Sequence, residues 1–303
     1  MSVQLNAGQA EGPAAVQRWF WPVVGVLGAA LGGLGVIVWL AANWESLGRA
    51  GRFGLLQALV LATCAGAWAR PALRAPLGLL ALLGIGGLFA YFGQTYQTGA
   101  DPWQLFALWA ALALPLCLGV RSDVLWAPWA LVVSTGISLW VHAHTGHQWR
   151  VQPADLPVFG AGFVASALLV AALAKPWRRF TGAGPWAQRT AGTLAVVMVT
   201  LTAIGGLFHK PVAPHYLLGL TVLAVAAAAL SRPRMFEVFV LSAVALGLNA
   251  LLVAGLIRLL FDGIRSDFIG SLFMVGIAAA GLLAASVSLI MRLSRRDAAK
   301  GRS

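Results

Sequence analysis

The chain has 303 residues, of which 60% are hydrophobic and only 10% are charged. Soluble globular domains are about 25% charged, so a chain of this length and composition cannot cover a water-facing surface and must present apolar surface to lipid. The net charge of +12 does not indicate nucleic-acid binding. The basic residues form short clusters between apolar runs, not one basic face with interleaved aromatic residues.

Ten apolar runs are long enough to be membrane-spanning helices, which need about 17–25 residues to cross a hydrocarbon core. They are too long and too continuous for barrel strands, which alternate over about ten residues, and a helix pairs its backbone groups within the segment. The predicted fold is an all-α polytopic transmembrane helical bundle. The predicted spans are Trp21–Ala42, Phe53–Ala69, Pro76–Gly93, Trp103–Val120, Val124–His142, Leu156–Ala174, Gln188–Leu207, Tyr216–Leu230, Phe236–Leu260 and Phe268–Met291.

These spans predict a single transmembrane domain over residues 21–291, with a first half at 21–142 and a second half at 156–291. Residues 1–20 are expected to be a short disordered tail, and residues 292–303 a basic tail that lies against anionic headgroups. The first apolar run is longer than the 7–15 residues of a signal-peptide core. We therefore expect this helix to be retained.

The basic residues predict the orientation of the chain. Ten spans place both termini and the even-numbered loops on one side, and 15 of the 21 Lys and Arg residues fall there, against 6 on the other side. Cytoplasmic loops carry the excess of positive charge. The prediction is a bacterial inner-membrane protein with both termini cytoplasmic.

Two polar segments on the predicted outer face are candidate ligand or partner contacts. One closes the first span, and the other separates the third and fourth spans, where amide and phenol groups can bind a polar ligand. Their structural alternatives are a helix exit with an interfacial tryptophan and a capped interhelical loop. The candidate residues are Asn43, Trp44, Glu45, Gln94, Tyr96, Gln97 and Asp101.

Three outer histidines, His142, His144 and His147, are the metal candidates, with Asp155 as a further oxygen ligand. Residues 142 and 144 lie about 200° apart on a helix, so only a loop could bring all three together. The alternative is a polar connector that responds to protonation. The two cysteines form no CxxC motif. We expect neither a metal nor another cofactor.

No arrangement of residues indicates catalysis, and the span interiors hold almost no ionisable residue. Intramembrane charges usually mark proton relays and ion paths, so a proton pump is disfavoured. The main hypothesis is a non-enzymatic envelope, assembly or ligand-sensing component in the bilayer, with other membrane proteins as possible partners and no nucleic acid. The alternatives are a small-molecule permease built from two inverted five-helix halves and an outward-facing metal-dependent enzyme.

The first half resembles a known family. Ala41-Ala42-Asn43-Trp44 closes the first helix, and Gly93-Gln94-x-Tyr96 precedes Gly99-x-Asp101. Leu108-Trp109-Ala110, Leu114-Pro115 and Arg121-Ser122 follow. In this order the motifs resemble the domain-of-unknown-function 2157 family of bacterial membrane proteins, between about Gly25 and Trp140. The resemblance implies a multi-pass membrane protein and supplies no activity. Members often carry a polar helical segment before the first span, whereas only about twenty residues precede it here.

Single-cysteine labelling tests the predicted orientation. With Cys64 and Cys117 replaced by alanine, Gln97→Cys should react with an impermeant maleimide in intact cells, and Thr181→Cys only after the cytoplasmic face is opened. The positive charge near residue 181 is the reason, because it holds that loop inside. The reverse labelling pattern contradicts the orientation.

Overall fold

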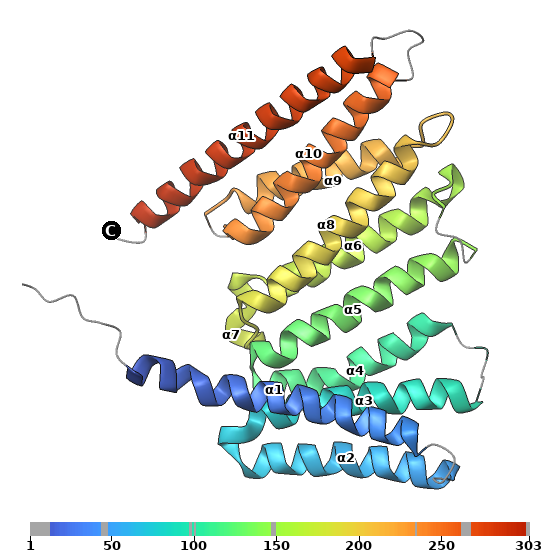
Figure 1. The fold of residues 1–303 in the computed structure, drawn as a ribbon, viewed down its shortest axis with the longest axis vertical. Coiled ribbons are helices and arrows are strands. Elements are labelled where there is room, and N and C mark those ends of the chain that lie inside the picture. Colours follow the sequence, from blue (N-terminus) through green and yellow to red (C-terminus); the bar gives the residue numbers. More distant parts are fainter. Residues whose placement is uncertain are drawn as a thin grey trace, which may run out of the picture. The chain divides into compact units, whose positions relative to one another are not determined.

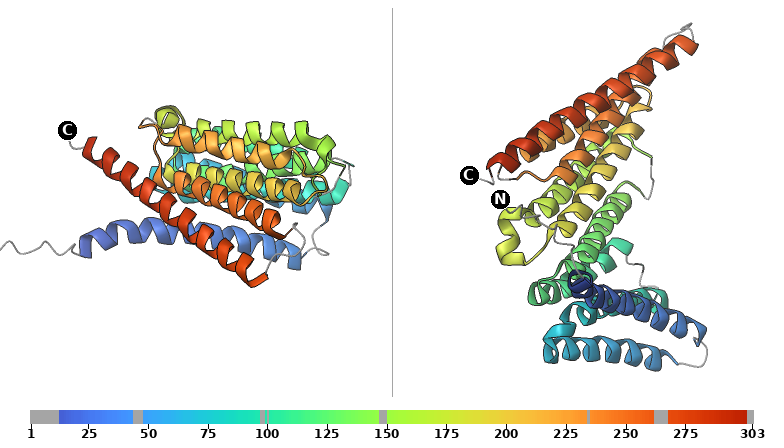
Figure 2. Two further views of the ribbon diagram at one scale, coloured as in Figure 1. Left: turned by 90° about the horizontal axis from the view of Figure 1, so that it is seen from above. Right: turned by 60° about the vertical axis from the view of Figure 1, so that its left-hand side comes forward.

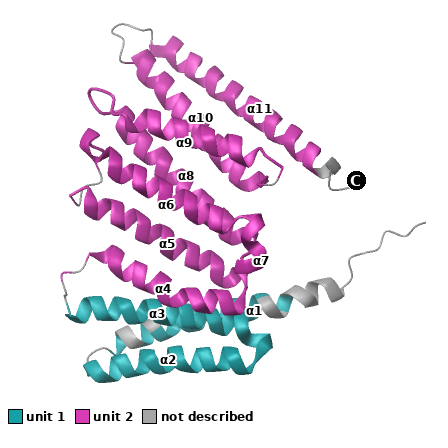
Figure 3. Ribbon diagram, turned by 180° about the vertical axis from the view of Figure 1, so that it is seen from behind, with its two compact units in different colours: residues 1–97 teal, residues 98–303 magenta. Residues whose placement is uncertain are grey.

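The structure is a computed structural model that describes residues 13–43, 48–96, 99, 101–146, 150–233, 235–261 and 268–300. All regular elements within these ranges are helices. The chain divides into two compact units, Met1–Gln97 and Thr98–Ser303 (Figure 3). Each unit is considered separately below.

Unit 1 consists of three long helices, with α3 packed against both of the others (Figure 1). Glycines allow close approach at both contacts: a Cβ on Gly33 of α1 would lie 3.0 Å from Leu80 Cδ1, and one on Gly84 of α3 would lie 2.9 Å from Val60 Cγ2. Small residues bring helices together in this way where lipid surrounds them. The elements are α1 (Pro13–Ala42), α2 (Arg49–Ala69), the 3₁₀ turn η1 (Pro71–Leu73) and α3 (Arg74–Tyr96).

Unit 2 is organised around α8, which packs against α5, α6, α9 and α10. Seen from above, α6 and α9 lie in one layer and α8 and α10 in the next (Figure 2). The elements are α4 (Pro102–Val120), α5 (Asp123–His144), η2 (Pro153–Asp155), α6 (Leu156–Ala172), η3 (Lys175–Trp177), α7 (Arg178–Thr181), α8 (Pro185–Leu207), α9 (His215–Leu230), α10 (Val238–Phe261) and α11 (Phe268–Lys300).

Each of the ten predicted spans coincides with a helix, which confirms the polytopic helical fold. Within the described residues, eight helices have both the length and the hydropathy to cross a membrane. The exceptions are α9, whose 16 residues extend about 24 Å at 1.5 Å per residue, and α1, in which the apolar part described is Val23–Val36.

The structure differs from the predicted domain boundaries at two points. Helix α1 begins at Pro13, inside the stretch expected to be a tail, and α11 continues through the basic segment to Lys300. The chain divides into its two compact units between residues 97 and 98, and a single transmembrane domain with halves at 21–142 and 156–291 stays a prediction. Hydropathy alone could not show these boundaries, because polar helical residues at a span end are indistinguishable from a tail.

The start of α5 is bonded to the start of α8 through Asp123. Its carboxylate accepts backbone hydrogen bonds from Gly184 at 2.9 Å, Trp186 at 2.7 Å and Ala187 at 3.0 Å. The first amides of a helix have no partner within it, and its N-terminus favours negative charge. Gly184 is required by this contact, because a Cβ there would lie 2.5 Å from Asp123 Oδ2. Asp123 therefore caps α8 from 61 or more residues away.

Further contacts gather at the same end of unit 2. The Trp126 indole N–H donates to the Thr181 carbonyl at 3.0 Å, and the Arg121 guanidinium donates to the Arg179 carbonyl. Arg189 of α8 forms an ion pair with Glu237 at 3.0 Å, and Glu237 also accepts from the Val240 amide at 2.7 Å, at the start of α10. Glu237 thus lies just before α10, not inside a span. The loops that precede α5, α8 and α10 share one end, as the predicted alternation of spans requires.

The Asp123 contact should account for a measurable part of stability. Replacing Asp123 by alanine removes three charge-assisted hydrogen bonds, and we expect it to lower the free energy of unfolding by about 2–4 kcal/mol. Asp123→Asn keeps one acceptor oxygen and should lose less. Unfolding in mixed detergent micelles, followed by circular dichroism, measures both; wild-type stability of Asp123→Ala would show that the contact is not formed.

Candidate functional site

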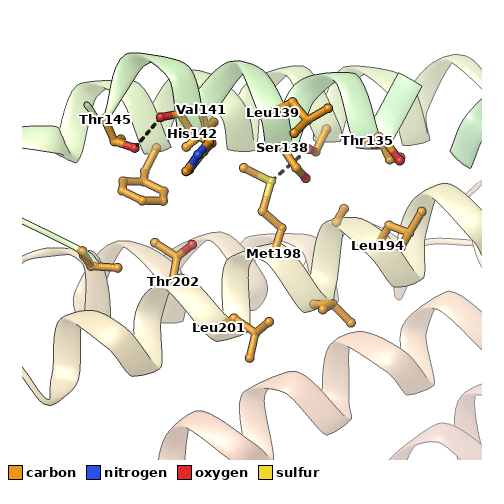
Figure 4. A pocket seen from close by; sticks show the side chains of 16 residues that line it. Thr135, Ser138, Leu139, Val141, His142, Thr145, Leu194, Met198, Leu201 and Thr202 are labelled. Atoms are coloured by element: carbon orange, nitrogen blue, oxygen red, sulfur yellow. Dashed lines mark hydrogen bonds between the residues drawn. The ribbon is translucent and has the colours of Figure 1, made fainter. Parts of the chain in front are cut away.

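A cleft of about 510 Å³ lies between α5 and α8, with α6 at its base. The labelled α5 side chains of Thr135, Ser138, Leu139, Val141, His142 and Thr145 form one wall, and those of Leu194, Met198, Leu201 and Thr202 from α8 form the other (Figure 4). Ser134, Val151, Phe159, Ser166, Ala195 and Val197 complete the lining. Its volume is within the range of about 300–1,000 Å³ typical of small-molecule sites.

One face of α5 supplies most of the polar groups. Ser134, Ser138, His142 and Thr145 are spaced four, four and three residues apart, which places them on a single helical face. Thr145 donates its hydroxyl to the His142 carbonyl at 3.1 Å. The four side chains form a polar line from the middle of α5 to its C-terminal end.

The opposite wall is more apolar and carries one further hydroxyl, that of Thr202, which is only 7% exposed. Met198 reaches toward α5, and its sulfur accepts a long hydrogen bond of 3.8 Å from Ser166 Oγ of α6. The hydroxyls of Ser134, Ser138 and Thr202 make no hydrogen bond to any part of the chain that the structure describes. They are therefore available to a ligand.

Close packing of α6 forms the base of the cleft. A Cβ on Gly162 would lie 2.6 Å from Val141 Cγ2 and 2.8 Å from Met198 Cε, so glycine is needed for α6 to approach both walls. Phe159 lines the cleft and meets the buried His215 ring edge to face at 5.1 Å. These contacts make the base a fixed surface.

Two apolar side chains of the lining, Leu201 and Val197, are 63% and 47% exposed. On a helix that spans a membrane, exposed apolar side chains such as these face hydrocarbon. Among the described residues, the lining contains hydroxyls and one imidazole but no carboxylate, lysine or arginine. Such a lining suits an uncharged amphipathic molecule.

The structure describes some of the predicted contact residues near the helix ends, and each of these has its own surroundings. Asn43 donates to the carbonyl of Trp39 in its own helix at 2.9 Å. Gln94 is exposed, and Tyr96 packs on Phe92 with ring centroids 4.9 Å apart. Trp44, Glu45 and Gln97 lie outside the described residues.

Asp101, the last of the predicted contact residues, occupies the N-cap position of α4, and Pro102 follows as the first helical residue. Its carboxylate makes no capping hydrogen bond. Asp101 belongs to unit 2, whereas Asn43, Gln94 and Tyr96 belong to unit 1. A shared ligand site of these residues stays a prediction.

The histidines point in different directions from α5. His142 lines the cleft, whereas His144 bonds to the Trp140 carbonyl at 2.8 Å and packs on the Trp140 and Trp103 rings. This matches the wide angular separation expected from their spacing. His147 lies outside the described residues, and among those described no three His, Cys, Asp or Glu side chains come together.

The cleft residues other than His142 were missed from the sequence. Serine and threonine are neutral and common in membrane helices, so a search for ionisable groups passes over them. The available signal was the spacing of Ser134, Ser138, His142 and Thr145 along one helical face. The partner residues on α6 and α8 have no such pattern, because only the packing of the helices brings Ser166 and Thr202 to the same cleft.

Comparison with known proteins identifies the first part of the chain. Residues 4–126 match the family model DUF2157, described as a predicted membrane protein. This stretch is similar to DUF2157 proteins, as its motifs predicted. The match includes Asp123 and ends before Ser134, so the cleft lies beyond it. No curated protein and no solved structure matches the chain.

Proposed function

We propose that this protein is a non-enzymatic, ligand-sensing component of a bacterial inner membrane that binds an uncharged amphipathic molecule between α5 and α8. The observation that supports the proposal is the cleft itself, in which Ser134 and Ser138 on α5 and Thr202 on α8 have hydroxyls without a hydrogen bond to the described residues. A hydroxyl or carbonyl headgroup would bond near His142 and Thr202. An alkyl chain would pack against Leu194 and Met198.

The predicted orientation places the open end of the cleft outside. The loop before Asp123 is one of the even-numbered loops, which carry the excess of positive charge and are predicted to be cytoplasmic. The Thr145 end of α5 would then face the periplasm. A ligand from that side or from the outer leaflet reaches the cleft without crossing the bilayer. This agrees with the expectation that function resides on the outer face.

The geometry also suggests how binding could be sensed. The α5 and α8 helices are joined by the Asp123 hydrogen bonds at one end, and the cleft separates them toward the other. A ligand that occupies the cleft would change the distance between the C-terminal ends of α5 and α8, while the Asp123 hydrogen bonds hold their N-terminal ends together. Binding energy can shift that equilibrium only if the two positions bind the ligand differently.

A small-molecule permease is the second candidate, because the cleft extends to Ser134, near the middle of α5. The α5 lining residues all lie between Ser134 and Thr145, and the Asp123 contacts join the helices at the opposite end. A permease must open that end as well. Unit 1 ends after α3, which does not correspond to two five-helix halves.

Photocrosslinking tests the proposed ligand site. The full chain in lipid nanodiscs is exposed to a diazirine-bearing medium-chain alcohol, and the labelled peptides are mapped by mass spectrometry. We expect labelling of the cleft faces of α5 and α8. Ser138→Leu fills the cleft and should reduce this labelling at least about fivefold, since a pocket discriminates by the volume and polar groups it offers.

The matched control is Ser242→Leu, the same exchange at an exposed position of α10. It should label like the wild type. Labelling spread evenly over all lipid-facing helices, or unchanged in Ser138→Leu, would contradict the proposal. Transport of the same alcohol analogue into protein-containing vesicles, reduced by Ser138→Leu, would favour the permease.

A further inference from the structure

The segment from Lys175 to Trp186, which joins α6 to the first turn of α8, exposes three large aromatic side chains. Trp177, Phe180 and Trp186 are 54%, 58% and 61% exposed. Their rings do not contribute to the core of unit 2. Tryptophan favours the headgroup level of a bilayer, where the ring meets hydrocarbon and the N–H meets water.

The backbone of this segment is held in place by α5. Thr181 and Arg179 accept hydrogen bonds from Trp126 and Arg121 through their carbonyls, and Gly184 and Trp186 donate to Asp123. The segment is thus anchored through its main chain, which leaves its exposed rings directed outward. A surface that is preorganised in this way loses little conformational entropy when a partner binds.

The segment carries three cations, Lys175, Arg178 and Arg179, of which two are exposed. Arg178 donates to the buried Gln188 amide at 2.9 Å, and Arg189 is paired with Glu237. Lys175 and Arg179 are exposed and have no ion pair with any described residue. The Arg179 guanidinium lies 4.5 Å from the centroid of the Phe180 ring. Two exposed cations without an acidic partner among the described residues thus belong to the same short segment as the exposed rings, and Arg179 lies against one of them.

We propose that residues 175–186 form a binding site for the phosphate headgroup of an anionic membrane lipid. Lys175 and Arg179 bind the phosphate, and the Trp177, Phe180 and Trp186 rings enter the interfacial layer beside it. The charge of the surface matches an anionic headgroup, since arginine and lysine are the usual ligands of phosphate. The exposed rings favour a lipid over a free phosphate ion, which offers them no apolar surface. The proposal is independent of the α5–α8 cleft.

Native mass spectrometry of the full chain tests the site. Detergent-solubilised protein is titrated with phosphatidylglycerol and, in parallel, with phosphatidylcholine. We expect the Lys175→Gln/Arg179→Gln variant to bind phosphatidylglycerol about tenfold more weakly than the wild type, because each basic residue near the surface contributes to attraction of an anionic lipid. Binding of phosphatidylcholine should be unchanged.

The matched control is Arg150→Gln/Lys210→Gln, which removes one arginine and one lysine that are also exposed but lie in other loops. It should bind phosphatidylglycerol like the wild type. If both double variants bind phosphatidylglycerol equally weakly, the loss is due to the change in net charge, and the proposed site is wrong. Displacement of bound phosphatidylglycerol by millimolar inorganic phosphate would overturn its assignment to a lipid. Unchanged melting temperatures confirm that the variants fold.

Discussion

The need to satisfy the first backbone amides of α8 is the constraint on which unit 2 depends. The first amides of a helix have no partner within it, and leaving a buried one unsatisfied costs about 1–3 kcal/mol. Asp123 solves this from another helix by accepting hydrogen bonds from Gly184, Trp186 and Ala187. One carboxylate thereby determines where α8, the helix that contacts four others, begins and which helix it lies beside.

The α5–α8 cleft and the exposed aromatic surface both follow from this junction. Because α5 and α8 are bonded at their starts, separation between them is possible farther along, where Ser134, Ser138 and His142 face Met198 and Thr202. The same contacts hold the segment before α8 so that Trp177 and Trp186 remain exposed. The junction thus lies between the exposed aromatic rings at one end of the unit and the cleft farther along α5 and α8.

The sequence predicted the helical membrane fold well, because apolar run length is a direct consequence of bilayer thickness. It also predicted that His142 and His144 diverge, since helical geometry alone determines their angle. It did not predict the Asp123 contacts, which join residues 61 or more positions apart, or the pairing of Arg189 with Glu237. The cleft was missed because its hydroxyls become a site only when α5, α6 and α8 pack. Trp44, Glu45, Gln97 and His147 remain sequence-based candidates.

The most direct test of the central claim, a partly polar cleft between α5 and α8 that opens at the Thr145 end of α5, is the reactivity of a thiol placed in it. In a chain with Cys64 and Cys117 replaced by alanine, Ser138→Cys is compared with Ala130→Cys, which is on the same helix at a fully buried position. A charged, water-soluble methanethiosulfonate should modify Ser138→Cys at least about tenfold faster, because thiol reactivity depends on access and on the thiolate form. Equal, negligible reaction of both thiols would contradict the cleft.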